Sequence, residues 1–274
     1  MNTDAIPCRL CAAPANFKFA RQAKDGDDVR CYECSACHSL QTEVPYWLEA
    51  EYAASAADTH LNLDTYAADR SLRSRTAVYF LWKFAGFKSP QDKLLDWGGG
   101  VGLMVRLLRD AGIDAYLYDK YAKNHFASGF IRSEHDSYSV VTAFEVFEHF
   151  ANPVVDLQAV FSLDPALLVI STGVYTNQGA DWPYLGPAKS EHVFFYSEQA
   201  LELIGHRFGY GVIRLRHGMT LFFKDPIAAQ RLRWAGRLLS RDYLADIAFA
   251  LIRKRSHCDA DNQKIRAKTG ELGA

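Results

Sequence analysis

The spacing of apolar residues in the middle of the chain predicts strands and helices in alternation. Four short apolar runs have the length of buried strands, at residues 94–97, 115–118, 140–144 and 167–171. Segments with helical spacing alternate with them, at residues 71–87, 103–111, 153–161 and 197–208. This alternation predicts an α/β fold, in which helices cover both faces of a mainly parallel sheet and the crossovers are right-handed.

The pattern changes after residue 208. Two short apolar runs, at residues 212–215 and 220–223, flank His217 and Gly218 and predict a hairpin. A hairpin at this point gives the sheet an antiparallel edge. The following segment carries a basic amphipathic helix and then a polar tail. Its arginines, Arg231, Arg233, Arg237 and Arg241, form either a solvated helix face or a surface for a membrane or a partner.

Composition places the protein among ordinary globular chains. Of its 274 residues 49% are hydrophobic and 23% are charged, which allows a sizeable core. The net charge of −1 gives no support for a nucleic-acid partner. There is no apolar run of about 18 residues, so no transmembrane segment is expected. The first residues lack a basic stretch followed by an apolar one, and we therefore expect a cytoplasmic protein. The oligomeric state stays open.

Five of the six cysteines lie between residues 8 and 37. Cys8 and Cys11 form one C-x-x-C pair, and Cys34 and Cys37 form another. In a chain without a secretion signal, such pairs indicate metal ligands rather than disulfides. Four thiolates around zinc leave no open coordination position, so the expected zinc is structural. Cys31 has the same spacing from Cys34 and is an alternative ligand.

A glycine-rich loop follows the first strand of the α/β segment. It runs from Asp96 to Gly102 with the sequence DWGGGVG and leads into a helix, whose N-terminal N–H groups favour a carboxylate or phosphate. Asp119 ends the next strand, where a carboxylate can accept both ribose hydroxyls. A glycine run alone can be a mere turn, but the combination predicts nucleotide binding. The acid two residues before the first glycine favours S-adenosylmethionine over a dinucleotide.

Glu145, Glu148 and His149 follow the strand at 140–144, where ligands bind in doubly wound sheets. In a helical conformation these three would share one face. Three interpretations stay open: an ordered polar strand end, a carboxylate–histidine pair for acid–base chemistry, and a metal site. His192 lies between the last parallel strand and the next helix. It is the preferred general base, the alternative being a structural loop histidine.

Three segments carry a resemblance to a known family. The loop LDWGGGVG resembles motif I of class I S-adenosylmethionine-dependent methyltransferases, and VVTAFEVFEH at 140–149 is similar to their fourth-strand motif. SEHVFFYS at 190–197 is similar to a stretch of the same relatives. The resemblance extends from about residue 46 to 223. It implies a Rossmann-like methyltransferase fold, doubly wound, with a seven-stranded sheet and an antiparallel edge hairpin. It also implies that these residues bind the cofactor: Asp96, Gly98, Gly99, Gly100, Gly102 and Asp119.

The cysteine pairs resemble the zinc-binding segment that precedes sugar methyltransferase domains and ends in C-x-x-C-G-L-x-Q. Here the stretch reads CSACHSLQ, so His38 stands in place of the usual glycine. The residue order of that family favours Cys34 and Cys37 over Cys31 as ligands. The resemblance implies a small zinc ribbon before the α/β domain.

The Glu-x-x-Glu-His pattern with a distant histidine also resembles small-RNA 2′-O-methyltransferases and some ubiquinone-pathway O-methyltransferases. That resemblance implies a divalent cation held by Glu145, Glu148, His149 and His192. We otherwise expect methyl transfer to a small-molecule or glycan-type acceptor, such as a nucleotide-linked sugar. The alternatives are a non-catalytic module that binds cofactor or recruits a protein, and a metal-assisted RNA 2′-O-methyltransferase.

The predicted organisation has four parts. Residues 1–42 form a zinc-knuckle module and residues 43–92 a helical lead-in. Residues 93–225 form the S-adenosylmethionine-binding domain, and residues 226–274 carry the basic helix and polar tail.

Overall fold

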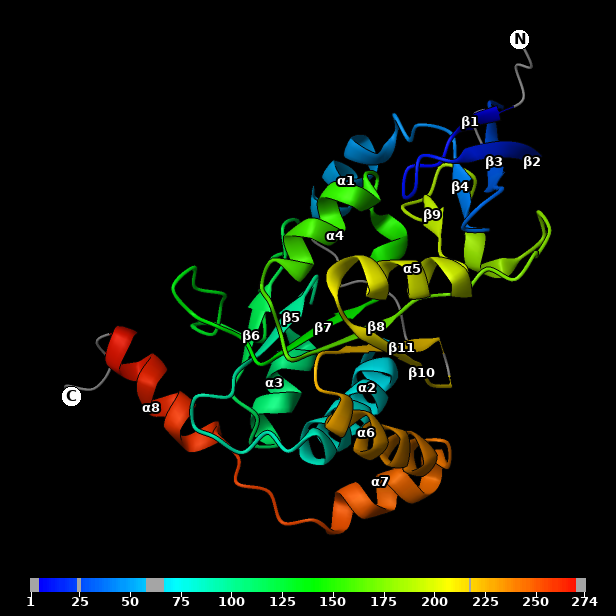
Figure 1. Ribbon diagram of the computed structural model, residues 1–274. Coiled ribbons are helices and arrows are strands. Elements are labelled where there is room, and N and C mark those ends of the chain that lie inside the picture. The colour runs from blue at the N-terminus through cyan, green and yellow to red at the C-terminus, as the bar shows by residue number, and fades with distance from the viewer. Residues whose placement is uncertain (1–4, 24–25, 58–66, 217, 270–274) are drawn as a thin grey trace. The chain divides into compact units, whose positions relative to one another are not determined.

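The computed structural model of the protein describes residues 5–23, 26–57, 67–216 and 218–269 (Figure 1). His217, expected at the hairpin turn, and part of the predicted lead-in, residues 58–66, lie outside the described residues. The chain forms two compact units. The first, here called the ribbon unit, consists of residues 1–59, 144–163 and 170–222. The second, here called the loop unit, consists of residues 60–143, 164–169 and 223–274.

A six-stranded sheet confirms the predicted α/β fold. Its strand order is β10-β11-β8-β7-β5-β6. The strands are β5 (Leu94–Trp97), β6 (Ala115–Tyr118), β7 (Val140–Phe144), β8 (Leu167–Ser171), β10 (Gly211–Arg214) and β11 (Met219–Phe223). β5 pairs in parallel with both β6 and β7. β10 and β11 are neighbours, and the four residues between Arg214 and Met219 are too few for a parallel crossover, so the pair is antiparallel.

The expected count of seven strands is not confirmed, because the sheet has six among the described residues. Beyond β6 the chain makes one parallel bridge, between Leu117 and Ile131, rather than a seventh strand. Ser133 begins a turn at once, because its N–H donates to the Tyr138 hydroxyl at 3.0 Å and its carbonyl accepts from Asp136. Only a short stretch around Ile131 is therefore free to pair with β6.

Side-chain caps begin the helices that follow these strands. Asn152 accepts a hydrogen bond from the Val155 N–H at the start of α4 (Pro153–Phe161). Ser197 accepts from the Ala200 N–H at the start of α5 (Glu198–Phe208), as the sequence predicts. Helix α3 (Leu103–Asp110) begins directly after the glycine loop. These helices and α2 (Ala67–Ala85) confirm the predicted helical segments.

A second, five-stranded sheet occupies the ribbon unit. Its order is β1-β2-β3-β4-β9, with neighbouring strands antiparallel. The strands are β1 (Ala5–Pro7), β2 (Pro14–Gln22), β3 (Asp28–Cys34), β4 (Leu40–Thr42) and β9 (Phe194–Phe195). The last strand comes from a distant part of the sequence, and it pairs Phe195 with Leu40. The ribbon therefore takes in a segment that the sequence places more than 150 residues later.

The remaining helices are α1 (Leu48–Ala57), α6 (Pro226–Leu239), α7 (Asp242–Leu251) and α8 (Cys258–Thr269). Two short 3₁₀ turns, η1 (Phe147–His149) and η2 (Pro183–Leu185), lie in the ribbon unit. In the loop unit α2 packs against α3, α6 and α7 (Figure 1). The polar tail expected after the basic helix contains α8, which Asp261 anchors by accepting two hydrogen bonds from buried Arg109, both at 2.7 Å.

Candidate functional site

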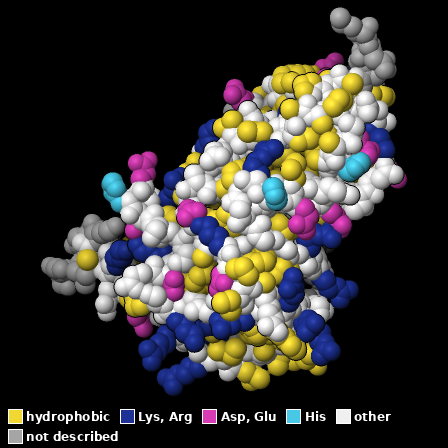
Figure 2. Space-filling model, in the orientation of Figure 1, with side chains coloured by type: hydrophobic (Ala, Val, Ile, Leu, Met, Phe, Trp, Pro, Cys, Tyr) yellow, Lys and Arg dark blue, Asp and Glu magenta, His cyan; other side chains and the backbone are white. Residues whose placement is uncertain are grey.

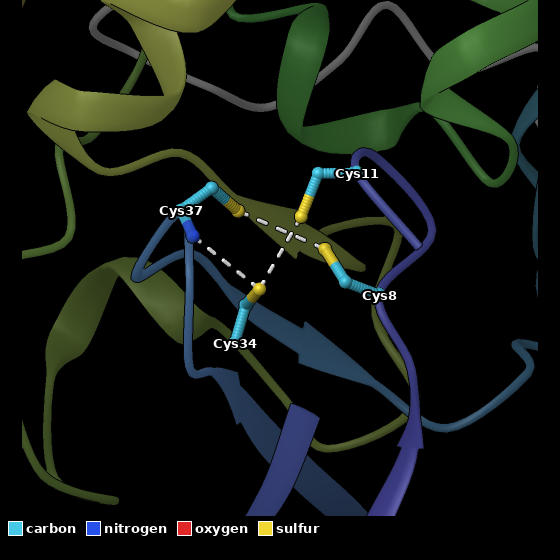
Figure 3. A group of neighbouring side chains, drawn as sticks. All are labelled: Cys8, Cys11, Cys34 and Cys37. Atoms are coloured by element: carbon cyan, nitrogen blue, oxygen red, sulfur yellow. Dashed lines mark hydrogen bonds between the residues drawn. The ribbon is translucent and has the colours of Figure 1, made fainter. Parts of the chain in front are cut away.

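The four predicted zinc ligands come together in the ribbon unit. The sulfur atoms of Cys8 and Cys37 lie 3.7 Å apart, and those of Cys11 and Cys34 lie 3.4 Å apart (Figure 3). All four sulfur atoms lie within 4.8 Å of one another. Sulfur atoms about 2.3 Å from a tetrahedral zinc ion are separated by about 3.8 Å, so this cluster has the size of a zinc site. Backbone N–H groups of Ala36 and Cys37 also donate to the Cys34 sulfur at 3.4 Å.

Both cysteine pairs adopt the same turn. In each, the residue after the second cysteine donates its N–H to the carbonyl of the first. Ala12 donates to Cys8 at 2.9 Å, and His38 donates to Cys34 at 3.1 Å. Both donors have positive φ, 62° for Ala12 and 55° for His38. This conformation explains the glycine of the resembling family at the second position, because glycine adopts it without steric cost.

Cys31, the alternative ligand, lies elsewhere in the ribbon. Its side chain is buried in an apolar cluster with Leu40, Tyr175, Leu185 and Phe195. Burial raises the pKa of the Cys31 thiol to about 12. A thiol in these surroundings packs as a small apolar group rather than as a metal ligand.

The ribbon holds the segment next to His192. The Thr42 N–H donates to the Val193 carbonyl at 3.1 Å, and the half-buried Arg9 guanidinium donates to the same oxygen at 2.5 Å. The Val193 N–H donates to the Glu148 carbonyl at 2.8 Å. Val193 is thus fixed from both sides, by the five-stranded sheet and by the turn that carries Glu148.

The glycine loop of the loop unit needs its glycines for three different reasons. Gly98, Gly100 and Gly102 have φ of 71°, 57° and 85°, a region that suits glycine. A side chain on Gly99 would come within 2.4 Å of the Asp96 carboxylate. A side chain on Gly100 would meet no atom within 4 Å, so the loop presents bare backbone to open space there. That face is where a ligand can approach the N–H groups closely.

Two carboxylates flank the loop. Asp96 is buried at the end of β5 and accepts a hydrogen bond from the Thr142 hydroxyl at 2.7 Å. Burial, and to a lesser extent the charge of Asp119, raise the pKa of Asp96 to about 7, although the bond from Thr142 opposes the shift. Asp119 accepts from the Gly100 N–H at 2.8 Å and from the N–H groups of the turn that follows β6. The acid and the loop therefore form one preorganised cradle.

These residues fit S-adenosylmethionine. The open face at Gly100 admits a ligand against backbone. Asp119 Oδ1 already accepts two backbone hydrogen bonds, whereas Oδ2 accepts one and keeps lone-pair capacity for a ribose hydroxyl. Asp96, with its pKa near neutrality, can turn anionic beside a cationic amino group. The loop thus offers N–H groups that can bind the carboxylate of the ligand. The two aspartates offer carboxylates that can bind its hydroxyl and ammonium groups.

A tyrosine joins the two glutamates of the ribbon unit. The Tyr184 hydroxyl donates toward Glu148 at 2.6 Å and toward Glu145 at 2.9 Å. Burial and the two negative charges raise the pKa of Tyr184, so it keeps its proton and acts as a donor. Burial first, and then the charge of Glu145, raise the pKa of the fully buried Glu148 to about 7. The glutamates meet through Tyr184, not on one helix face, because Glu145 has φ of 53° and precedes the turn η1.

Two histidines complete this cluster. His192 Nδ1 lies 2.6 Å from the Tyr184 carbonyl oxygen, which can only accept, so Nδ1 carries the proton. The neutral ring then leaves Nε2 able to take a proton. His149 lies 4.0 Å from Glu148 through Nε2 and 3.4 Å from Glu191 through Nδ1. Ligand atoms of Glu148, His149 and His192 lie within 4.8 Å of one another, a set that leaves out Glu145.

A pocket of about 360 Å³ opens in the ribbon unit beside this cluster. Its polar lining includes Glu145, Tyr184, Thr172, and an ion pair between Arg214 and Glu198. Apolar surface comes from Val174, Leu215 and Met219. Of the predicted catalytic residues, Glu145 alone lines the pocket among the described residues.

Gly173 explains how Tyr184 reaches the glutamates. A side chain at Gly173 would come within 2.3 Å of the Tyr184 ring, so the ring lies directly on the backbone that follows β8. Tyr184, Gly173, Arg214 and Glu198 were not among the site residues that the sequence predicted. The loop motif gave no signal for them, since they become neighbours through the fold.

The chain matches a family model described as a methyltransferase domain over residues 46–215. Because this match covers more than half of the sequence, the chain belongs to the methyltransferase-domain family and is an S-adenosylmethionine-dependent methyltransferase. A comparison with curated proteins gives no match.

Several solved structures are similar in fold. A 1,6-didemethyltoxoflavin-N1-methyltransferase from Burkholderia thailandensis is 14% identical with a TM-score of 0.49, over 76% of this chain and 100% of that chain. A magnesium protoporphyrin IX methyltransferase from Synechocystis PCC 6803 is 14% identical with a TM-score of 0.38, over 65% and 95%. CalO1, from calicheamicin biosynthesis, is 14% identical with a TM-score of 0.38, over 56% and 55%, so the match spans about half of its length. Similarity at this level says nothing about the acceptor.

No helix among the described residues has the length and apolar character that crossing a bilayer requires.

Proposed function

We propose that this methyltransferase modifies a small-molecule or glycan-type acceptor, such as a nucleotide-linked sugar, bound in the pocket of the ribbon unit. The observation that carries the proposal is the pocket itself. Its volume of about 360 Å³ suits a small ligand or one end of a larger one. Hydroxyl-bonding groups such as Glu145, Tyr184 and Thr172 alternate with apolar surface, which suits a polyhydroxylated ring. Two glutamates in the lining disfavour a nucleic-acid backbone.

In this proposal the glycine loop binds the methyl donor. When bound, S-adenosylmethionine supplies an electrophilic methyl group. The loop N–H groups receive its carboxylate, Asp96 receives its amino group, and Asp119 accepts hydrogen bonds from its ribose. Gly98, Gly99, Gly100 and Gly102 allow this approach because none of them has a side chain. Binding and orientation supply much of the rate in such a displacement.

His192 is the proposed general base for an acceptor hydroxyl. The bond from its Nδ1 to the Tyr184 carbonyl, 2.6 Å long, leaves Nε2 unprotonated in the neutral ring. Glu145 and Tyr184 line the pocket and are the proposed groups that orient the hydroxyl. The buried Glu148 carboxylate accepts a hydrogen bond from the Tyr184 hydroxyl at 2.6 Å and so fixes the position of this hydroxyl.

A divalent cation is the second candidate for this cluster, with His192 as ligand instead of base. It is favoured by Glu148 Oε2, which is buried and has no hydrogen-bond partner among the described residues. The grouping of Glu148, His149 and His192 within 4.8 Å supplies oxygen and nitrogen donors that suit magnesium, manganese or zinc. Glu145 would join as a fourth ligand after a side-chain rotation. The four cysteine thiolates are the proposed ligands of a separate, structural zinc ion.

Transfer of label from methyl-labelled cofactor tests the proposal. Purified protein is incubated with a pool of nucleotide sugars and small glycans, and in parallel with total RNA. Label in the first pool is the expected result, and label in RNA alone would reject the acceptor class. We expect Asp119→Ala to weaken S-adenosylhomocysteine binding by about 10- to 100-fold, the effect of lost bonds to a charged group. Asp110→Ala, on the exposed side of α3, is the matched control.

His192 separates the two candidate roles. We expect His192→Ala to lower kcat by about 10²- to 10⁴-fold, as for loss of a general base, with unchanged binding of S-adenosylhomocysteine. Calorimetry with Mn²⁺ on the zinc-loaded protein distinguishes the cation. Binding that His149→Ala removes supports the metal site, and no Mn²⁺ binding leaves His192 as base. Wild-type turnover of His192→Ala rejects both roles.

A further inference from the structure

The last helices of the loop unit expose apolar side chains where a globular protein usually buries them. On α7 the residues Tyr243, Ile247 and Leu251 follow one another at helical spacing and are 70%, 46% and 81% exposed. The opposite face of the helix buries Ala245 and Phe249. The helix is therefore apolar on both sides, and only one side packs against the protein.

Helix α6 carries a matching outer face of mixed character. Ile227 and Trp234, two turns apart, are 73% and 54% exposed, while Leu232 is buried on the inner side. Arg231, Arg237 and Arg241 fall on or beside the same outer face by helical spacing and are exposed. The Arg237 guanidinium stacks on the Trp234 ring, with 4.6 Å between the guanidinium carbon and the ring centroid. An aromatic ring and a cation are thus presented together.

The charge of this segment differs from that of the chain. Residues 226–255 hold seven basic and two acidic side chains, a net charge of +5, whereas the whole chain has −1. Figure 2 shows hydrophobic side chains over α7 with Lys and Arg side chains on either side of them. We call the exposed residues Ile227, Trp234, Tyr243, Ile247 and Leu251, with Arg231, Arg237, Arg241 and Arg253, the α6–α7 face.

We propose that the α6–α7 face binds the surface of a membrane that contains anionic lipids. Helices that lie on a bilayer combine apolar side chains, Trp or Tyr at the headgroup level, and basic residues around them. Anionic headgroups satisfy the arginines, and the acyl boundary takes Ile247 and Leu251 out of water. The protein would sit on such a surface without crossing it, in keeping with its lack of a spanning helix among the described residues.

Other partners fit the same face less well. In a two-fold dimer the face would meet its own copy, and two surfaces of charge +5 would repel. A nucleic acid would neutralise the arginines but would leave Tyr243, Ile247 and Leu251 exposed to water. Of these three partners, an anionic lipid surface alone both neutralises the arginines and buries the exposed apolar side chains of the α6–α7 face.

Vesicle flotation with the full chain tests the proposal. We expect the protein to float with phosphatidylcholine vesicles that contain phosphatidylglycerol, not with phosphatidylcholine alone, and to detach as salt is raised. Replacing Arg237 and Arg241 by glutamine should weaken partitioning roughly fivefold for each charge removed. Trp234→Ala and Leu251→Ser should each weaken it roughly tenfold.

Matched controls keep this test specific. Val155→Ser, at a 60% exposed position on α4, and Lys88→Gln, at an exposed loop position, should leave flotation unchanged. All variants should bind S-adenosylhomocysteine like the parent, which separates this proposal from the catalytic one. Absence of flotation with anionic vesicles would overturn the proposal. So would equal flotation of the Trp234 and Leu251 variants, a dimer that these substitutions dissociate, or tighter binding to nucleic acid than to vesicles.

Discussion

The two units of the molecule build their functional groups in opposite ways. In the loop unit, Asp96, the glycines and Asp119 come from one strand–helix–strand passage of 24 residues. In the ribbon unit, the proposed acceptor site consists of Glu145, Tyr184 and His192, which lie beside a five-stranded sheet that begins at residue 5. The first site depends on local backbone geometry and the second on long-range packing. We therefore expect that substitutions in the ribbon unit can abolish acceptor binding while the glycine loop still binds the cofactor.

The largest expected effect comes from removing one of the proposed zinc ligands. We expect Cys34→Ser to release zinc and lower methyl transfer at least 100-fold, since structural zinc contributes on the order of 10 kcal/mol to folding at such sites. Binding of S-adenosylhomocysteine should change less than threefold, because the glycine loop lies in the other unit. Elemental analysis, calorimetry and turnover measure the three quantities.

Cys31→Ser serves as the control for this change, because that thiol packs in an apolar cluster away from the four sulfur atoms. It should retain zinc. Loss of cofactor binding in step with turnover would contradict the independence of the two units.

Protonation of Asp96 is the next largest effect and belongs to the loop unit. Its pKa of about 7 lies above the ordinary value of 3.8, so the folded state favours the protonated form. Stability without cofactor should therefore fall as pH rises from about 4 to 7, by at most about 4 kcal/mol. Affinity for S-adenosylhomocysteine should rise over pH 6 to 8, because a cationic amino group favours ionised Asp96.

Asp96→Asn provides the comparison, since it keeps the shape and the bond with Thr142 but cannot ionise. Urea unfolding and calorimetry across this pH range should show both slopes reduced. Slopes identical to the parent would assign the titration to another group.

The acceptor pocket should respond to changes at Tyr184 with a smaller loss. Tyr184→Phe removes the hydroxyl that links Glu145 and Glu148, and we expect kcat/KM for the acceptor to fall about 10- to 100-fold. Gly173→Ala should have a similar effect by displacing the ring. Gly179→Ala, in the same connecting segment with an exposed backbone, is the control and should retain parental kinetics. Steady-state kinetics at saturating cofactor provide the measurement, and an unchanged KM and kcat in Tyr184→Phe would remove this residue from the site.

The smallest expected effect sharpens the description of the ribbon. His38 has φ of 55°, where glycine carries no steric cost, so His38→Gly should stabilise the zinc-bound protein by about 0.5 to 1 kcal/mol. Thermal unfolding at fixed zinc concentration measures the change. A lower melting temperature would mean that the imidazole makes a contact worth more than the backbone strain.

Much of the fold was predictable because its signals are local. The runs that became β5, β6, β7 and β8 are short and mostly apolar, and Asn152 and Ser197 cap the helices α4 and α5. The glycine loop was predictable since one continuous motif contains it. The seventh strand is not found among the described residues because the chain turns at Ser133, and this turn depends on the Tyr138 hydroxyl, a contact that hydrophobic periodicity does not contain.

The proposed acceptor site was predictable only in part. Glu145, Glu148, His149 and His192 follow strand ends, which flagged them as candidates. Tyr184 gave no such signal, because its place depends on the absence of a side chain at Gly173, eleven residues earlier. The pairing of β9 with β4 was also beyond reach, as two-residue strands have no recognisable period.

The pairing of β9 with β4 has a consequence for changing the proposed acceptor specificity. The stretch between the end of β8 and the start of β9 is held near its two ends. Near the first, the Tyr184 ring packs on Gly173. At the second, the Val193 carbonyl accepts hydrogen bonds from Arg9 and Thr42. Mutations between these anchors can reshape the wall of the cavity while the anchors keep their positions. We therefore expect that this stretch can be exchanged between homologues, and that such exchanges alter the substrate preference.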